Sequence, residues 1–210
     1  MSTTYDTRKD FFNERAEKWM DMFYKDESTG EYTKFDHKFK RLFDLIAIKN
    51  GDYILDVGCG SGILVPYILK RIGEKGRLHE LDYAVNMIKV NKQIHNDQRI
   101  EFLNIDIIDI NIGEAFYDIV ICFSCFPHLD DKKTAMKVMS RILKTGGKLT
   151  VAHFDSSAEI NSHHRKSSEV MHDQLPHKDC MKSLFDKNNL KINKFIDDDG
   201  FYLVLGEKSK

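Results

Sequence analysis

Short apolar runs and amphipathic runs alternate along most of this chain of 210 residues. The apolar runs are rich in β-branched and aliphatic residues and predict strands near 53–57, 77–82, 100–105, 117–123 and 147–154. Between them, apolar residues recur at three- and four-residue steps and predict helices near 63–72, 84–96 and 131–144, with a weak one near 111–115. This alternation is typical of βαβ units in a parallel sheet with both faces covered. We therefore expect an α/β fold.

The first fifty residues predict two helices ahead of the sheet. Apolar and aromatic residues recur at helical spacing from Phe11 to Phe23 and, after a polar turn, from Phe35 to Ile46. The second set is typical of a core helix. The first set carries more aromatic surface than an outer helix needs. Two interpretations stay open for it: plain packing, or a lid whose apolar face covers a pocket.

The alternation stops after Asp155, where a polar, histidine-rich stretch begins. A helix resumes around Met181, and residues 190–196 and 201–205 predict a hairpin with an Asp-Gly turn. The chain has the length of one α/β domain. We expect a single domain with these parts: a helical cap over 1–50, a core over 51–155, a polar insertion over 156–177, and a helix with a hairpin over 178–210.

The composition favours a small-molecule partner. Lysine and arginine number 32 against 33 acidic residues, and no long block of like charge occurs. This balance argues against nucleic acid or an anionic membrane as partner. No run approaches the roughly 18 apolar residues of a membrane span, and the first residues lack a signal-peptide core. We expect a cytoplasmic protein that binds neither nucleic acid nor membrane.

Four cysteines are scattered through the chain, at positions 59, 122, 125 and 180. They are too few for a disulfide framework in a chain of this length, so we expect reduced thiols. Cys122 and Cys125 have metal-motif spacing and His128 follows. A second ligand pair at zinc spacing is missing, so we interpret them as small, partly buried residues.

A glycine-rich run follows the first predicted strand and precedes a helix. It reads Asp56-x-Gly58-x-Gly60-x-Gly62. Glycines at such a turn let a ligand approach the main chain closely. A dinucleotide fingerprint has its third glycine one place later and an uncharged strand end for the pyrophosphate. Asp56 would repel a pyrophosphate and attract a cation, so the pattern favours a nucleoside-like ligand with positive charge.

Aspartates end the next two strands. Ligands of open α/β sheets bind outside the carboxyl ends of the strands, where such residues converge. Asp82 stands about twenty residues beyond the glycine run, the place from which a carboxylate accepts ribose hydroxyls. Asp106 is positioned to accept an exocyclic amine. Either one taken singly is more often a helix cap or a solvated acid; together with the glycine run, they favour a nucleoside site.

These ordered motifs resemble those of the class I S-adenosylmethionine-dependent methyltransferases. The resemblance continues through Tyr117-Asp118-Ile119-Val120 and Leu143-Lys144-Thr145-Gly146-Gly147, with Thr145 where a proline is usual. It implies a Rossmann-like, doubly wound seven-stranded sheet with an antiparallel last strand, and S-adenosyl-L-methionine as cofactor. The roles it implies are Asp56 at the methionine ammonium, the backbone of Gly58, Cys59, Gly60 and Gly62 against the cofactor, Asp82 on the ribose, Tyr83 and Met87 beside the adenine, and Asp106 with Ile107 at the adenine edge. We place Phe123, at the end of the fourth strand, with this set.

Three further segments are similar to small bacterial and archaeal methyltransferases near the ubiquinone/menaquinone-biosynthesis C-methyltransferases. They are Phe11-Phe12 with Ala16 and Trp19, then Phe126-Pro127-His128, then Asn161, His164 and Leu175-Pro176. The resemblance implies methyl transfer from S-adenosylmethionine to an acceptor. We expect a small molecule between the Phe11–Trp19 helix, the Phe126–His128 turn and the insertion, and a monomer or homodimer.

His128 and His153 are the candidate catalytic residues, because both fall at strand ends on the cofactor edge and imidazole titrates near neutral pH. For each, a partly buried histidine satisfied by backbone groups is the competing interpretation. The insertion adds His163, His164, His172 and His177, but they lack a ligand spacing, so we predict no metal.

Two rival classes remain. One is a non-catalytic module that keeps the cofactor fold, because a fold does not fix a function. The other is an NAD(P)-dependent enzyme, which Asp56 and the glycine spacing disfavour.

Overall fold

The computed structural model describes residues 4–209 and contains a seven-stranded sheet in the order β3-β2-β1-β4-β5-β7-β6. Its strands are β1 Tyr53–Val57, β2 Arg77–Leu81, β3 Ile100–Leu103, β4 Tyr117–Phe123, β5 Leu143–His153, β6 Leu190–Asp198 and β7 Phe201–Lys208. Strands β1 to β5 are parallel, whereas β7 is antiparallel to both β5 and β6. The Rossmann-like sheet with a reversed last strand is confirmed.

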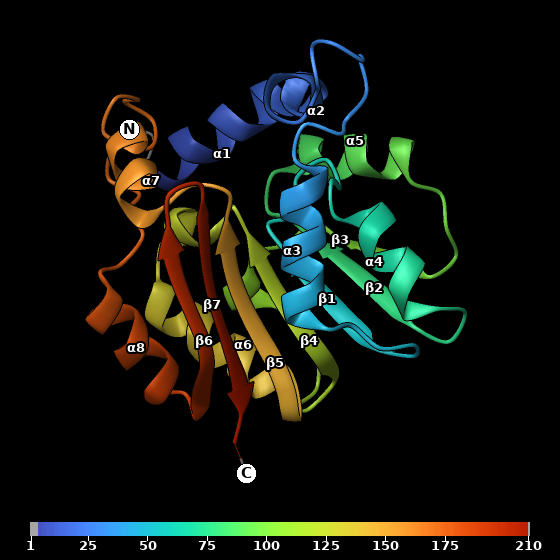
Figure 1. Cartoon of the computed structure of the whole chain (residues 1–210), viewed down its shortest axis with the longest axis vertical. Coiled ribbons are helices and arrows are strands. Elements are labelled where there is room, and N and C mark those ends of the chain that lie inside the picture. Colours follow the sequence, from blue (N-terminus) through green and yellow to red (C-terminus); the bar gives the residue numbers. More distant parts are fainter. Residues whose placement is uncertain (1–3, 210) are drawn as a thin grey trace.

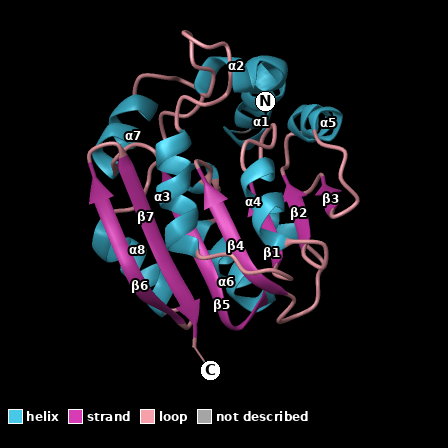
Figure 2. Cartoon of the chain, turned by 45° about the vertical axis from the view of Figure 1, so that its right-hand side comes forward, coloured by secondary structure: helices cyan, strands magenta, loops and turns pink. Residues whose placement is uncertain are grey.

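Helices cover both faces of the sheet (Figure 1 and Figure 2). They are α1 Thr4–Arg15, α2 Trp19–Phe23, α3 Asp36–Ile46, α4 Val65–Ile72, α5 Val85–Ile94, α6 Lys132–Ile142, α7 Ser157–His164 and α8 Lys178–Asp186, with 3-10 turns η1 Ala16–Lys18, η2 Ile107–Asp109 and η3 Phe126–His128. Helices α3 and α4 pack on one face, and α6 and α8 pack on the other.

The central strand β4 shows why the sheet is buried on both sides. Ile119, Ile121 and Phe123 join the core cluster of α3 and α4. Val120 and Cys122 alternate with them and join the cluster of α6 and α8. Successive side chains of a strand point to opposite faces, so a continuous apolar run fits only a strand that is covered twice.

The segment 111–115 and the start of β5 differ from the sequence prediction. The weak helix predicted near 111–115 was wrong: the segment forms a turn, in which Ala115 has a left-handed φ of 54°. Strand β5 begins at Leu143 and not at 147, because Leu143 already pairs with Tyr117 before the register shifts. The paired glycines therefore lie within the first part of β5.

The N-terminal segment lies across the carboxyl ends of the parallel strands (Figure 1). The aromatic spacing predicted one helix from Phe11 to Phe23, but the segment is divided into α1, η1 and α2. Asn13 joins this segment to α5, because its Oδ1 accepts a hydrogen bond from the Asn86 backbone N–H at 2.9 Å. In residues 4–209, the helices are too short or too polar to cross a membrane.

The polar stretch after Asp155 is partly helical. Helix α7 begins with a capping box in which the Ser156 hydroxyl and the Glu159 carboxylate satisfy each other's backbone N–H groups. The predicted hairpin is confirmed and is longer than expected, since Asp198 pairs with Phe201 across the Asp199-Gly200 turn. Gly200 has a φ of +70°, which suits that turn.

Candidate active site

A pocket opens at the carboxyl ends of β1, β2 and β4, beneath α1 and α2. It encloses about 890 Å³, part of it open to solvent. Its lining from the strand ends and the loops after them is Asp56, Val57, Gly58, Cys59, Gly60, Ser61, Ile63, Leu64, Leu81, Asp82, Tyr83, Met87, Ile105, Asp106, Ile107, Phe123, Ser124, Cys125, His128 and Leu129. The N-terminal segment contributes Tyr5, Phe12, Trp19, Met20 and Tyr24. These side chains favour the lid interpretation of the first helical segment.

The glycine run forms the floor of this pocket. Gly58 and Gly60 have φ values of +66° and +55°, a region that glycine adopts at little cost. A Cβ at Gly58 would overlap Cys125, and a Cβ at Gly60 would stand 3.7 Å from the Trp19 indole nitrogen. The main chain at Gly60 is therefore open toward the lid, and a side chain there would take up ligand space.

Gly62 does not line the pocket, contrary to the role that the resemblance implied. A Cβ at Gly62 would overlap Asn91 and stand 2.8 Å from His95 Cδ2, both on the α5 side. The third glycine of the run thus allows close packing between the loop and α5. It is a packing residue here.

Asp56 is a buried carboxylate with an unsatisfied oxygen. Its side chain is 1% exposed, and Oδ2 has no hydrogen-bond partner within residues 4–209. Burial, followed by the charge of Glu80, raises the pKa of Asp56 well above its ordinary value. An unpaired buried carboxylate is costly, so a cation with N–H donors that enters the pocket at Asp56 is stabilised there.

Asp82 supports the glycine loop as well as facing the pocket. Its Oδ2 accepts a hydrogen bond from the Gly60 N–H at 3.0 Å, and its Oδ1 accepts one from the Ala84 N–H at 2.8 Å. Burial raises the pKa of Asp82 to about 6, while these two hydrogen bonds favour the ionised form. Each oxygen keeps a further lone pair for a ligand hydroxyl.

Asp106 is in contact with the lid. Its Oδ1 accepts a hydrogen bond from the Ile108 N–H at 3.1 Å, and its Oδ2 accepts one from the Tyr5 hydroxyl at 3.0 Å. The ring of Tyr5 also packs on Tyr83, with centroids 5.3 Å apart. Tyr5 therefore closes the side of the pocket at which Tyr83 and Asp106 stand.

His128 lies at the opposite side of the same pocket, in η3 after β4. Its Nδ1 is 2.7 Å from Asp173 Oδ2, and its ring packs edge-on against Phe12 with centroids 5.1 Å apart. Burial lowers the pKa of His128 below its ordinary value, although the hydrogen bond to Asp173 opposes that shift. The imidazole is therefore neutral at pH 7, and Nε2 is the ring nitrogen left for a ligand.

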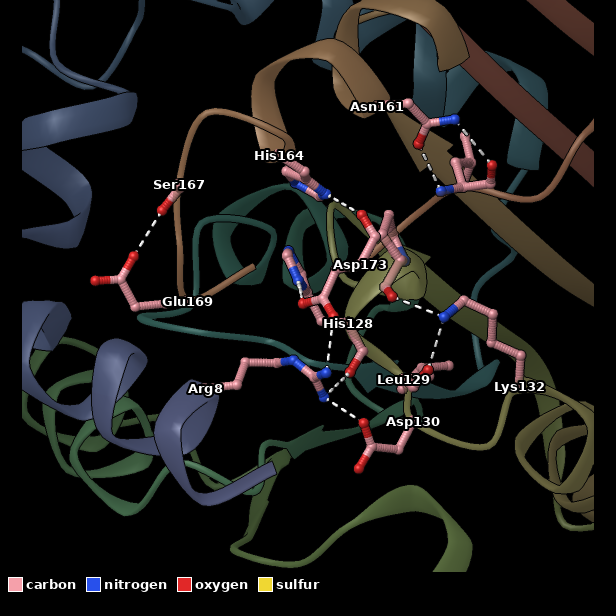
Figure 3. Close-up of polar contacts among 12 residues, drawn as sticks. Arg8, His128, Leu129, Asp130, Lys132, Asn161, His164, Ser167, Glu169 and Asp173 are labelled. Atoms are coloured by element: carbon pink, nitrogen blue, oxygen red, sulfur yellow. Dashed lines mark hydrogen bonds and ion pairs between the residues drawn. The ribbon is translucent and has the colours of Figure 1, made fainter. Parts of the chain in front are cut away.

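Arg8 of α1 connects the lid to this histidine (Figure 3). Its Nη1 donates to the His128 carbonyl at 2.9 Å and to Asp130 Oδ1 at 2.7 Å. Its Nη2 donates to Asp173 Oδ1 at 2.7 Å, and both members of that pair are buried. Burial opposes ionisation of Asp173, but His128 and Arg8 outweigh it and lower the pKa of Asp173.

His153 does not line the pocket, which differs from its predicted place beside the acceptor. It lies at the end of β5, 5% exposed, and pairs in register with Tyr202. Burial, followed by the nearby His128 and His164, lowers its pKa to about 3. It is therefore a neutral histidine buried within the sheet.

Among the insertion histidines, His164 joins His128. Its Nδ1 lies 2.6 Å from the Asp173 carbonyl, and its ring centroid is 4.8 Å from that of His128. Over residues 4–209, no group of three or more His, Cys, Asp or Glu side chains is arranged to hold a metal ion. The expectation of no metal stays a prediction.

Cys122 and Cys125 are both buried, and Cys125 Sγ donates to the Val57 carbonyl at 2.8 Å.

Sequence reasoning missed Tyr5, Tyr24, Arg8 and Asp173. Tyr5 and Tyr24 stand just outside the aromatic repeat that marked the lid. Arg8 is one charged residue among several in α1, and Asp173 is one acidic residue of the polar insertion. Their contacts join segments up to 165 positions apart, and local patterns carry no signal for such pairs.

Comparison with known proteins agrees with this geometry. Residues 55–151 match a family model described as a methyltransferase domain. The chain is 30% identical over 115 residues to the chloroplastic 2-phytyl-1,4-beta-naphthoquinone methyltransferase of Arabidopsis thaliana, covering 52% of this chain and 44% of that protein. It is 30% identical over 109 residues to demethylmenaquinone methyltransferase of Staphylococcus carnosus, covering 51% and 45%. The matches therefore span less than half of these relatives.

A solved structure extends the similarity to nearly the whole chain. The SAM-dependent methyltransferase from Aquifex aeolicus superposes with a TM-score of 0.72 at 16% identity, covering 92% of this chain and 97% of that one. At this identity the superposition shows the fold alone, and the domain model matches residues 55–151, just under half of the chain. The chain is therefore similar to S-adenosylmethionine-dependent methyltransferases in its fold and in its matched core. That similarity makes S-adenosylmethionine the cofactor to compare with the pocket.

The residues of the pocket fit that cofactor. The unsatisfied Oδ2 of Asp56 suits an ammonium group, and the space above Gly60 would be filled by a Cβ. Asp82 has lone pairs for ribose hydroxyls, and Tyr83 and Met87 line the wall beyond it. The pocket thus offers a buried carboxylate with an unsatisfied oxygen, Asp56, and a carboxylate with free lone pairs, Asp82, at adjacent strand ends.

Proposed function

We propose that this chain transfers a methyl group from S-adenosylmethionine to a small-molecule acceptor bound beside His128. One observation carries the proposal: Asp56, whose Oδ2 has no hydrogen-bond partner in the described part of the chain, and the neutral imidazole of His128 line the same lidded pocket. Asp56 supports binding of a cationic donor, and His128 supports handling of the acceptor's proton.

The assigned residues have distinct tasks. Asp56 would hold the ammonium of the cofactor, the main chain at Gly58 and Gly60 would lie against it, and Asp82 would accept its ribose hydroxyls. Cys59, Tyr83, Met87, Asp106, Ile107 and Phe123 would complete the cofactor site. When bound, S-adenosylmethionine supplies a methyl group on a positively charged sulfur, and the carbon–sulfur bond breaks with its electron pair staying on sulfur.

The lid supports a small acceptor. Phe12, Trp19 and Tyr24 cover the pocket from the N-terminal segment, which excludes water and aligns reactants. A macromolecular acceptor would need this cover displaced. The relatives named above are methyltransferases of quinone-related compounds, which supports an acceptor with a ring that packs on aromatic side chains.

Calorimetry followed by turnover tests the proposal. We expect S-adenosylmethionine and S-adenosylhomocysteine to bind, with no binding of NADH. We then expect S-adenosylhomocysteine to form when a panel of thiols, phenols, amines and quinol precursors is supplied. If neither cofactor form binds, the proposal is wrong. Binding without turnover across the panel would instead favour a non-catalytic cofactor module.

A further inference from the structure

Arg8, Asp173 and His128 form one continuous chain of hydrogen bonds drawn from three separate segments (Figure 3). Arg8 belongs to α1, Asp173 to the 156–177 insertion, and His128 to the turn after β4. The two carboxylate oxygens have different partners: Oδ1 accepts from Arg8 at 2.7 Å, and Oδ2 faces His128 Nδ1 at 2.7 Å. This division of partners fixes the orientation of the Asp173 side chain.

The arrangement selects one tautomer of His128. An ionised carboxylate only accepts hydrogen bonds, so Nδ1 must carry the hydrogen that Asp173 Oδ2 accepts. The lone pair of the neutral ring then resides on Nε2, the nitrogen available to a ligand in the pocket that His128 lines. Aspartate fixes the tautomer of a catalytic histidine in the same way in other enzymes.

We propose that Asp173 and Arg8 are positioning residues that hold His128 as the Nδ1–H tautomer while α1 is closed, so that Nε2 accepts the proton of a thiol or phenol acceptor. This inference rests on the proposed function for its acceptor and on the geometry of the three residues for its tautomer.

The proton transfer balances with methyl transfer. The acceptor's S–H or O–H proton passes to His128 Nε2, and the electron pair of that bond stays on the acceptor atom. That atom forms the new bond to the methyl carbon, while the positive charge that began on the sulfonium ends on the His128 imidazolium. Asp173 stabilises this imidazolium through Nδ1–H. A neutral imidazole suits an acidic acceptor, whereas an ammonium would first have to lose a proton to bulk solvent.

The lid takes part because Arg8 belongs to it. Arg8 is 4% exposed and Asp173 is 3% exposed, so their pair is desolvated while α1 is closed. If α1 moves away, Asp173 loses its Oδ1 partner and is free to rotate. Closure over the substrates therefore also completes the base, a coupling that limits proton transfer in the open state.

Several charged or titratable groups face His128, and each affects its protonation. Asp173 raises its pKa, whereas His164 from the insertion and Arg8 from α1 lower it. His153 from β5 is neutral, with its own pKa at about 3. A change in the titration of His128 must therefore be compared with matched variants before it is assigned to Asp173.

Nitrogen NMR of the histidine rings tests the tautomer without any acceptor. The protein is labelled with ¹⁵N-histidine and saturated with S-adenosylhomocysteine, and His128→Gln identifies the His128 signals. We expect neutral His128 with hydrogen on Nδ1. A His128 that carries its hydrogen on Nε2 overturns the proposal.

Asp173→Asn is the critical variant. Arg8 donates to Oδ1, so the asparagine must keep its oxygen there and turn its NH₂ toward His128. Nδ1 then becomes the acceptor and the hydrogen moves to Nε2. Asp130→Asn is the matched control, because Asp130 binds Arg8 and does not contact the imidazole. We expect the tautomer to invert in Asp173→Asn and to persist in Asp130→Asn; the same tautomer in all three proteins overturns the role of Asp173.

Arg8→Met tests the part played by the lid, because it keeps the apolar stem and removes the guanidinium. We expect faster tryptic cleavage within α1 and loss of the narrow Nδ1–H signal of His128 in the same variant. No change in either measurement overturns the coupling to the lid.

The acceptor class is tested by turnover. We expect thiols or phenols to be methylated, with kcat falling about 10²–10⁴-fold in Asp173→Asn and KM for S-adenosylmethionine little changed. Methylation of amines but of neither thiols nor phenols overturns the acceptor assignment. Absence of turnover with every compound contradicts the proposed function, whereas the tautomer measurement is decided independently.

Discussion

Asp56 on β1 and Glu80 on β2 are partners in the parallel register, and both carboxyl groups are buried. Each keeps one oxygen that has no hydrogen-bond partner within residues 4–209. The charge of Glu80 raises the cost of ionising Asp56, in addition to the cost of burial. This pair beneath the glycine run makes the stability of the fold sensitive to pH.

Glu80→Gln should remove part of that sensitivity. Burial raises the pKa of Glu80 from 4.5 to about 8. A folded-state pKa above the unfolded value contributes stability that is full below about pH 4.5 and is lost as pH rises through 8. We expect Glu80→Gln to raise the Tm of the ligand-free protein at pH 8 and above, by about 2–4 °C for each kcal/mol gained.

Thermal unfolding from pH 5 to pH 9 checks this expectation. His153 has the opposite dependence, because its depressed pKa costs stability as pH falls below about 6.5, the usual histidine value. The parent protein and Glu80→Gln share that loss, so the difference between their curves of Tm against pH isolates the contribution of Glu80. Parallel curves over the whole range would contradict the prediction.

Asp56→Asn should weaken binding of the amino-acid end of the cofactor selectively. An asparagine cannot balance the charge of an ammonium, so we expect S-adenosylhomocysteine to bind about 10–100-fold more weakly, the cost of losing a charged hydrogen bond. The control ligand is methylthioadenosine, which has the nucleoside and lacks the amino acid. Calorimetry should show equal affinity of variant and parent protein for that ligand; equal losses for both ligands would indicate a distorted pocket.

Asp82→Ala should weaken the binding of both S-adenosylhomocysteine and methylthioadenosine. Asp82 would lose its ribose contacts, and the N–H groups of Gly60 and Ala84 would lose their acceptor. We expect each affinity to fall by more than about 1 kcal/mol, together with a lower Tm of the ligand-free protein, because buried donors are left unpaired. Unchanged affinity for methylthioadenosine would remove Asp82 from the nucleoside site.

Gly58→Ala should destabilise the fold more than Gly51→Ala. Both glycines have positive φ, at +66° and +90°, so alanine is strained at each by about 1 kcal/mol. Only at Gly58 does the new Cβ overlap a neighbour, Cys125, whereas nothing lies within 4 Å of it at Gly51. Urea unfolding should show an additional loss of about 1–3 kcal/mol for Gly58→Ala. Equal losses would mean that Cys125 gives way without cost.

The local pattern of the chain was sufficient for most of the fold. Strands β1 and β4 have the predicted bounds, since a run such as Ile119 to Phe123 is apolar on both faces and strongly favours a covered strand. Predictions failed where local pattern competes with pairing. Leu143 joins β5 because Tyr117 offers it a partner across the sheet, and that contact is invisible in the neighbouring sequence.

The candidate site divides in the same way. Asp56, Asp82 and Asp106 lie at or just after the carboxyl ends of three parallel strands, and parallel topology alone brings such strand ends together, so the sequence located the pocket. Gly62 and His153 also lie near strand ends in the sequence, but neither lines the pocket. Gly62 packs against the α5 side, and His153 is buried in the sheet.

The sequence by itself determined most of the strands and helices, the glycine turn and the charge at each strand end, because these features depend on residues within one element and its neighbour. Only the tertiary structure decided which residues support His128. Arg8 and Asp173 are 165 positions apart, and their meeting depends on how α1 and the insertion pack over the sheet. A desolvated ion pair between distant segments has no local signature, because its energy arises only after the surrounding chain has excluded water.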